Sequence, residues 1–218
     1  MNKQTSINID FIRLLLCIVV IGSHILDLLN INNYFNNNFD FYCVWLFFVL
    51  SGYLNIESIE KKSEGFLYRR FKRLLPKYYI ALGLSFIIYL IFENLTYEAL
   101  SIFGANALMA QHLFIFNAPD TNTALWSLSY EFLFYILLSC YFKDRLIFII
   151  LIVITFLWGL LNEYVLMLGA GFLIGILLNK YKIELDFIRL KNLKLSKYTY
   201  EIYIFHFPIM YLIFHLTF

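Results

Sequence analysis

Two ionisable residues that could take part in binding or catalysis lie in one long apolar segment near the start of the chain, residues 7–29. Arg13 and His24 are eleven residues apart, so on a helix they share a face and lie about 16 Å apart along the axis. An arginine in such a segment can hold a phosphate, and a histidine can act as a general base. A structural interpretation stays open, in which Asp10 pairs with Arg13 at i,i+3 and His24 only hydrogen-bonds at the segment's end.

A second polar set begins at Trp126, where Ser127, Glu131 and Tyr135 follow one another at i,i+4 and share a helix face. We expect Glu131 and His24 at similar depth below the outer boundary of a membrane. A histidine and a glutamate at matched depth would orient and activate a hydroxyl. The alternative is a structural ion pair, or a protonated glutamic acid hydrogen-bonded between helices.

Two further elements carry weaker signals. In the last apolar segment Pro208 follows His206, and the missing backbone N–H of the proline frees the carbonyl of Ile204. A basic run that includes Arg70 and Arg73 can hold a polyanion. Each has an ordinary explanation, because proline kinks are common in membrane helices and basic runs mark cytoplasmic loops.

The composition indicates what positions these residues. The chain has 218 residues, of which 61% are hydrophobic and 15% are charged, against about 45–50% and about 25% in soluble domains. This excludes a soluble globular protein, a disordered protein and a nucleic-acid binder, and it predicts an integral membrane protein. Cys17, Cys43 and Cys140 lie in apolar stretches without metal-ligand or disulfide spacing, so we expect them to pack as small hydrophobes.

The hydropathy pattern predicts an all-α, polytopic transmembrane helix bundle of 7–8 membrane segments in a single domain, residues 1–218. An ambiguous segment, residues 99–116, contains Asn106, Gln111 and His112. The seven clear segments are residues 7–29, 39–56, 78–92, 124–142, 146–161, 164–179 and 198–218.

The positive charges decide how the ambiguous segment is interpreted. Lysine and arginine are enriched in cytoplasmic loops of membrane proteins. If residues 99–116 do not cross the membrane, sixteen of the 17 lysines and arginines are cytoplasmic and Arg13 lies in the membrane. If the segment crosses, eight positive charges move to the outer side. We therefore predict seven crossings, a cytoplasmic N-terminus, an outer C-terminus, and a re-entrant or interfacial element at 99–116 that protein or a wet cavity must shield.

Taken together and in order, these motifs resemble the acyltransferase-3 family of integral-membrane acyltransferases. The resemblance covers nearly the whole chain. The motifs that carry it are Asp10, Arg13 and His24; Phe47-Phe48-Val49-Leu50-Ser51-Gly52-Tyr53-Leu54; Arg70 and Arg73 ahead of Pro76; Trp126, Ser127, Leu128 and Glu131; the glycine-containing segment 169–177; and Tyr203-Ile204-Phe205-His206-Phe207-Pro208.

The resemblance implies transfer of an acyl group, most often acetyl, from cytosolic acyl-CoA to a hydroxyl of a sugar, surface polysaccharide or lipid-linked glycan. It implies acyl-CoA as a donor substrate, with no permanently bound cofactor and no metal, in a bacterial plasma membrane. The roles it implies are acyl-CoA contacts for Arg13, Arg70 and Arg73; catalysis by His24, with Glu131 supporting the acceptor side; and positions around the cavity for Asp10, Ser51, Gly52, Trp126, Ser127, Tyr203 and His206, of which Ser51 and Gly52 also allow close helix approach.

The chain departs from the family in its length. It resembles a short version of a ten-helix fold, with fewer middle helices and no further helix after residue 218. We expect a compact active member, truncated at its C-terminus relative to the family, in which self-association or a partner subunit is one way to complete the cavity. The alternatives are a small transporter or flippase-like protein in glycan export, and an inactive remnant. Transport is disfavoured because no paired, similarly interrupted helices occur in two halves.

Overall fold

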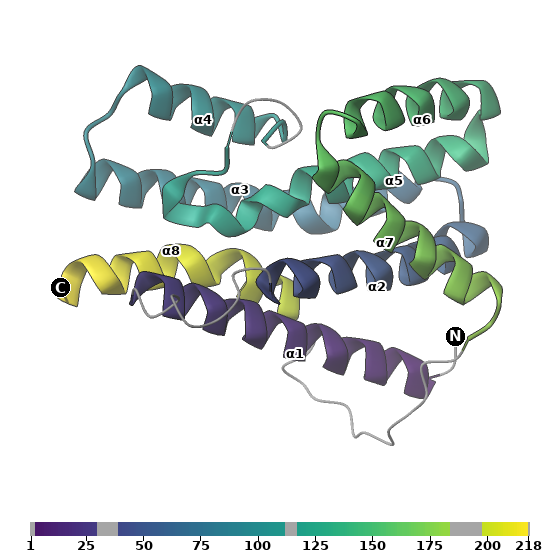
Figure 1. Ribbon diagram of the computed structural model, residues 1–218, viewed down its shortest axis with the longest axis horizontal. Helices are drawn as coiled ribbons and strands as arrows, with labels where there is room; N and C mark the ends of the chain where they lie inside the picture. The colour runs from purple at the N-terminus through teal and green to yellow at the C-terminus, as the bar shows by residue number, and fades with distance from the viewer. Residues whose placement is uncertain (1–2, 30–38, 112–116, 184–197, 218) are drawn as a thin grey trace.

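The computed structural model describes residues 3–29, 39–111, 117–183 and 198–217, and over these ranges its regular elements are all helices (Figure 1). The predicted all-α fold class is confirmed. The elements are α1 (Lys3–Leu28), α2 (Phe39–Lys61), α3 (Phe66–Phe92), α4 (Tyr97–Ala107), the 3₁₀ segment η2 (Asp120–Ser127), α5 (Leu128–Lys143), α6 (Arg145–Gly159), α7 (Glu163–Lys180) and α8 (Thr199–Thr217).

Five of the described helical stretches are long and apolar enough to cross a membrane, and they match five of the seven predicted crossings. The helix α6 is apolar but has 15 residues, fewer than the roughly 17 that a crossing needs. The helix α8 contains Glu201, His206 and Pro208 and is not among the five. The crossing of these two helices stays a prediction. The five stretches are Gln4–Leu28, Phe39–Lys61, Phe66–Phe92, Asp120–Lys143 and Glu163–Lys180.

The segment at 99–116, predicted not to cross, contains a helix of 11 residues, α4, which is about 16 Å long and half of a bilayer core. Its polar side chains serve the structure. Asn106 donates to two backbone carbonyls, one in α4 and one just before η2, and Gln111 donates to the Tyr78 hydroxyl and to a carbonyl of η2. These buried hydrogen bonds pair backbone carbonyl oxygens. Lipid could not pair them, because it offers no hydrogen-bond donor. His112 lies outside the described residues.

Glycines bring α2 and α7 into backbone contact. A Cβ atom added at Gly52 would lie 2.0 Å from the carbonyl oxygen of Phe172, and one added at Gly175 would lie 1.9 Å from that of Val49. Real side chains do not tolerate such distances, so these positions need glycine. The close helix approach expected at Gly52 is therefore made with α7, whereas its neighbour Ser51 faces a cavity on the other side of α2.

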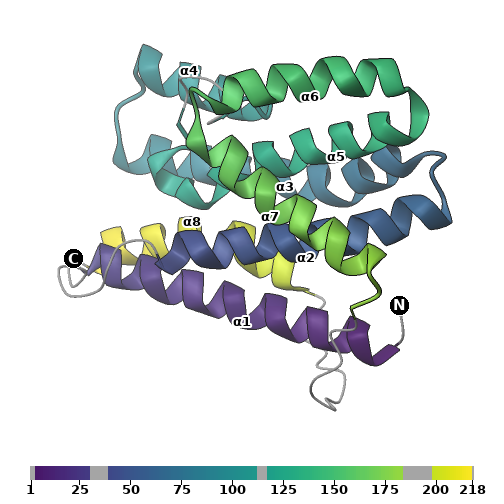
Figure 2. The same cartoon turned by 45° about the vertical axis from the view of Figure 1, so that its right-hand side comes forward.

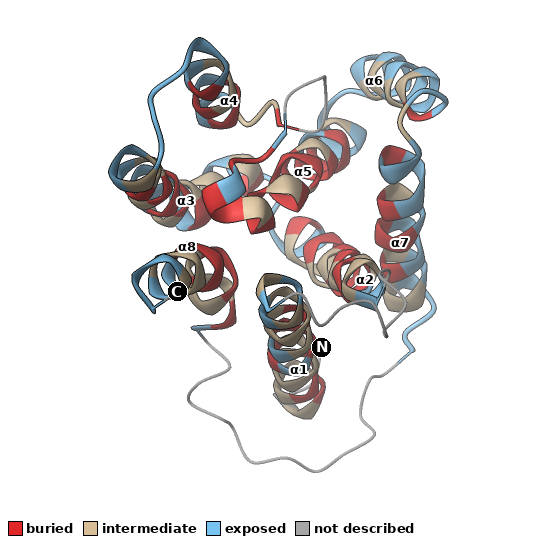
Figure 3. Ribbon diagram, turned by 60° about the vertical axis from the view of Figure 1, so that its left-hand side comes forward, coloured by how far each residue is buried: buried red, intermediate tan, exposed pale blue. Residues whose placement is uncertain are grey.

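The helices are arranged so that α2 and α5 lie inside the bundle and α6 lies at its periphery, with most of its surface exposed (Figure 3). The α2–α3 turn, the α5–α6 turn and the end of α7 lie at the same end of the molecule as the N-terminus (Figures 1 and 2). Lys61, Lys143, Arg145 and Lys180 lie at or beside these three places. Their common location agrees with the predicted one-sided distribution of positive charge, and which side faces the cytoplasm stays a prediction.

Candidate active site

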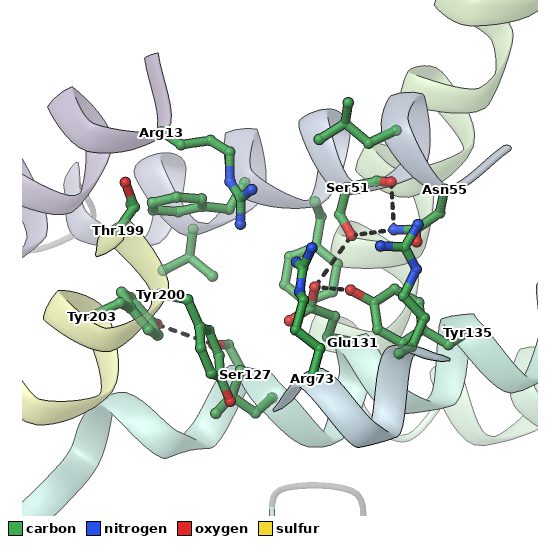
Figure 4. A pocket seen from close by; sticks show the side chains of 16 residues that line it. Arg13, Ser51, Asn55, Arg73, Ser127, Glu131, Tyr135, Thr199, Tyr200 and Tyr203 are labelled. Atoms are coloured by element: carbon green, nitrogen blue, oxygen red, sulfur yellow. Dashed lines mark hydrogen bonds between the residues drawn. The ribbon is translucent and has the colours of Figure 1, made fainter. Parts of the chain in front are cut away.

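A cavity of about 90 Å³ lies between α1, α2, α3, η2, α5 and α8 (Figure 4). Its charged lining consists of Arg13 from α1, Arg70 and Arg73 from α3, and Glu131 from α5. Residues that are far apart in the sequence therefore meet in one place. The other lining residues are Val44, Phe47, Phe48, Ser51, Leu54, Asn55, Ser127, Leu128, Tyr135, Thr199, Tyr200 and Tyr203.

The three predicted donor-side arginines all line this cavity. Arg13 and Arg73 point into the same space from opposite walls (Figure 4), and Arg70 lies 5.3 Å from the centre of the Phe66 ring. Arg69, next in the same basic run, instead donates to backbone carbonyls of the α2–α3 turn. The cavity lining has three guanidinium groups and one carboxylate, that of Glu131. Asp10 and Glu201 interact electrostatically with Arg73 from outside the lining. Guanidinium groups are suited to hold a phosphate.

Glu131 is held by hydroxyl groups within the cavity. Ser51 Oγ donates to Glu131 Oε1 at 3.3 Å, and the Tyr135 hydroxyl donates to the same oxygen. Asn55 Nδ2 in turn donates to Ser51 Oγ at 3.0 Å. The predicted shared face of Ser127, Glu131 and Tyr135 is seen, because all three line the cavity. Asn55 was not predicted, although its i,i+4 spacing from Ser51 was a usable signal.

His24 lies outside this cavity lining and stacks on His206, with ring centroids 5.4 Å apart and planes 21° apart. Its Nδ1 atom is 3.8 Å from Asp27 Oδ2. Sequence reasoning missed Asp27, whose i,i+3 spacing from His24 could have indicated it. His24 of α1 and His206 of α8 therefore form a stacked pair with Asp27 beside it, an arrangement that the sequence did not predict.

The expected matched depth of His24 and Glu131 stays a prediction. Glu131 lines the cavity with Arg13, whereas His24, about 16 Å from Arg13 along α1, does not line it. The segment η2, which leads into α5, consists of 3₁₀ turns with a kink at Asn122. The chain before Glu131 is therefore not the continuous α-helix from residue 124 on which that expectation was based.

Tyr203 contacts both the cavity and the histidine pair. Its hydroxyl is 3.0 Å from Ser127 Oγ, and its ring centroid is 5.7 Å from that of Phe47 and 5.9 Å from that of His206. Its backbone carbonyl accepts a hydrogen bond from His206 Nδ1 at 2.5 Å. The side chain of Tyr203 thus forms the boundary between the arginine-lined cavity and His24.

The carbonyl that Pro208 frees is used, as its chemistry requires. Asn122 Nδ2, from η2, donates to the carbonyl oxygen of Ile204 at 3.1 Å. Asn122 is fully buried and has a non-helical backbone, with φ −159° and ψ 71°. This bond ties α8, which carries His206, to the segment that leads into Glu131, so the proline creates an attachment point instead of ending the helix.

Three other predicted site residues do not line the cavity. Asp10 is half-buried and interacts electrostatically with Arg13 and Arg73. Trp126 packs its ring among aromatic neighbours, with its centroid 5.5 Å from that of Tyr164. Gly52 packs against α7, as described above. These residues support the site through packing and charge.

A protein-family model, described as an acyltransferase domain, matches residues 6–193 of the chain. The match includes the Arg13–His24, Arg70–Arg73 and Ser127–Glu131 motifs, and the segment from Tyr203 to Pro208 lies beyond it. Neither a curated protein nor a solved structure matches the chain. Because the family match covers most of the 218 residues, the protein belongs to the acyltransferase-3 family of membrane acyltransferases.

Proposed function

We propose that this protein transfers an acetyl group from acetyl-CoA to a hydroxyl of a sugar acceptor, in a surface polysaccharide or a lipid-linked glycan of a bacterial cell envelope. The donor enters from the cytoplasmic side of the plasma membrane, where the N-terminus also lies. The observation that carries the proposal is the arginine-lined cavity that ends at Tyr203, with His24 on the other side of that residue.

On the donor side, Arg70 and Arg73 lie in the first two turns of α3, close to the basic end of the molecule. They bind the phosphates of acetyl-CoA at this end, and Arg13 holds the donor on the opposite wall. The cavity of about 90 Å³ is well below the 300–1,000 Å³ of usual ligand pockets. Its size favours a short acyl group and leaves the nucleotide outside it.

On the acceptor side, His24 acts as the general base. Its Nδ1–H faces the Asp27 carboxylate, which leaves the lone pair of Nε2 to take the proton of the acceptor hydroxyl. The hydroxyl oxygen then attacks the thioester carbonyl carbon, the carbon–sulfur bond breaks, and the leaving thiolate takes the proton from His24. The acceptor gains an acetyl ester and free CoA is released.

The two sides meet when the Tyr203 ring moves aside. The Tyr203 hydroxyl bonds to Ser127, and the Tyr203 ring contacts the His206 ring, so this side chain lies between the cavity lining and the histidines. Movement of this one side chain exposes the thioester to His24 only after the donor has filled the cavity, which limits hydrolysis of the thioester by water.

Mass spectrometry of the cell-surface glycans tests this proposal, in cells with the gene, without it, and with His24→Ala. We expect an acetyl increment on a glycan only with the intact gene. Translocation of an unmodified glycan that depends on the gene but consumes no acyl-CoA would favour the transporter alternative. A protein that binds acetyl-CoA without turnover would favour the inactive remnant.

A further inference from the structure

His206 has an unused hydrogen-bond acceptor deep in the protein. Its side chain is 7% exposed, and its Nδ1 atom bonds to the carbonyl oxygen of Tyr203. A carbonyl oxygen only accepts, so Nδ1 carries the hydrogen and the neutral ring keeps a lone pair at Nε2. Among the described residues, that Nε2 atom has no hydrogen-bond partner. A buried acceptor without a donor costs free energy, and this points to a ligand that donates one.

The position of this acceptor connects it to His24. The two imidazole rings stack with planes 21° apart, and His24 presents its own Nε2 lone pair because Nδ1 faces Asp27. Two imidazoles in the same tautomer are therefore stacked on each other, each with one lone pair in its ring plane. Such a pair matches two hydroxyl groups of one molecule, each of which donates one hydrogen bond.

The charges around the pair restrict the kind of molecule. Asp27 and Asp40 both interact electrostatically with His24 and with each other. The sequence has no lysine or arginine at residues 14–60, 78–142 or 198–218, so α8 and the part of α1 that carries His24 supply no basic side chain. Carboxylates without a balancing cation repel an anionic ligand and tolerate an uncharged one.

We infer that His206 is an acceptor-binding residue that selects an uncharged sugar with neighbouring hydroxyl groups. His24 takes the proton of the hydroxyl that is acetylated, and His206 Nε2 accepts a hydrogen bond from the hydroxyl next to it. The inference rests on the proposed function and adds a substrate class to it: neutral vicinal diols, in preference to deoxy sugars and to acceptors that bear a carboxylate or phosphate.

The test uses the full-length protein in liposomes with acetyl-CoA and three acceptors: a neutral methyl glycoside with neighbouring hydroxyls, its monodeoxy analogue, and its uronic acid. We expect the wild-type kcat/KM to be at least about tenfold higher for the diol than for the deoxy sugar. The deoxy sugar lacks the second hydroxyl and leaves the buried His206 Nε2 without a hydrogen-bond donor. The uronic acid is expected to react more slowly than the neutral diol.

The variant His206→Phe keeps an aromatic ring against His24 and removes the lone pair. We expect the ratio of diol to deoxy-sugar kcat/KM to fall toward one, with the KM for acetyl-CoA unchanged. His206→Gln supplies an amide oxygen as acceptor and is expected to recover part of the ratio. Asp40→Asn should improve use of the uronic acid, whereas the control Glu98→Gln, in the first turn of α4, should leave both ratios as in the wild type.

Equal wild-type use of the diol and the deoxy sugar would overturn the role of His206 and leave the proposed function standing. A His206→Phe protein that keeps the wild-type ratio would do the same. Preference for the uronic acid would overturn the charge selection. Absence of transfer to all three acceptors would overturn the proposed function together with this assignment.

Discussion

At the residue scale, the basic run of α3 separates into side chains with different partners. Arg70 and Arg73 are three residues apart and line the cavity, whereas Lys72 between them lies 5.7 Å from the Tyr68 ring centre. Helical spacing alone produces this separation, because residues at i,i+3 share a face and residues at i,i+2 do not. We expect the positive charge of the whole run to set the topology, and only one of its faces to contact the proposed donor.

Arg70→Ala therefore tests the donor side. Loss of a charged hydrogen bond to phosphate is worth about 1.5–3 kcal/mol, so we expect the KM for acetyl-CoA to rise about 10–100-fold while the acceptor KM stays unchanged. Steady-state kinetics with each substrate varied in turn measures this. Lys72→Ala is the matched control, since it removes a cation from the same run outside the cavity. Equal effects of the two substitutions would mean that the run acts only through net charge.

At the element scale, two attachments position the site: the glycine contacts of α2 with α7, and the bond from η2 to α8. Ser51 faces the cavity because the opposite side of α2 is pressed against α7 at Gly52 and Gly175. His206 is positioned because Asn122 holds the carbonyl next to its turn of α8. Neither attachment contacts substrate in the proposed reaction. Both fix the positions of side chains that do contact it.

Gly175→Ala should destabilise the protein. The added Cβ would lie 1.9 Å from a backbone oxygen of α2, so the helices must separate, at a cost of about 1–3 kcal/mol or more. Thermal unfolding in detergent measures the loss. Gly83→Ala is the control, because an added Cβ there meets nothing within 4 Å and alanine favours the helix. If both substitutions left the melting temperature unchanged or raised it, the contact between α2 and α7 would be looser than described.

A double-mutant cycle tests the bond between Asn122 and α8. Asn122→Ala should cost about 1–3 kcal/mol, because it leaves the Ile204 carbonyl unpaired and buried. In a Pro208→Ala background the new backbone N–H donates to that carbonyl, so the same substitution should cost much less. Unfolding free energies of the four proteins give the coupling. Additive costs would contradict the assignment of Asn122 to the carbonyl that Pro208 frees.

At the whole-molecule scale, the sequence predicts a membrane bundle with one basic end. The described helix ends that carry Lys61, Lys143, Arg145 and Lys180 lie at the end that holds the N-terminus. Membership of the acyltransferase-3 family places acyl transfer in this bundle. The cavity with its arginines lies toward the basic end of α3, and the histidine pair lies farther along α1. The molecule thus separates a cationic region, the proposed donor side, from an acidic region, the proposed acceptor side.

Labelling of single cysteines tests the orientation. In a background without the three native cysteines, Tyr97→Cys at the start of α4, where the native side chain is 89% exposed, should react with a membrane-impermeant maleimide on intact cells. Glu64→Cys in the α2–α3 turn should react only after permeabilisation. The reverse pattern would invert the predicted topology and place the arginines on the outer side.

Regular spacing made parts of this site predictable. The face shared by Ser127, Glu131 and Tyr135 follows from i,i+4 periodicity, and the free carbonyl beneath Pro208 follows from the chemistry of proline. The 3₁₀ segment and kink before Glu131 were not predictable, because hydropathy does not distinguish a 3₁₀ entry into a helix from an α-helical one. The stacking of His24 on a histidine of α8 is a long-range contact that no local pattern encodes.

The most direct test of the central claim is acetyl transfer by purified protein in liposomes, with labelled acetyl-CoA supplied at the basic face and a neutral sugar at the other. We predict labelled sugar with the wild-type protein and none with His24→Ala, while His24→Ala still binds acetyl-CoA through the arginines. Undiminished transfer by His24→Ala would contradict the account, because the arginine-lined cavity would then contain the whole reaction and the histidine pair would have no part in it.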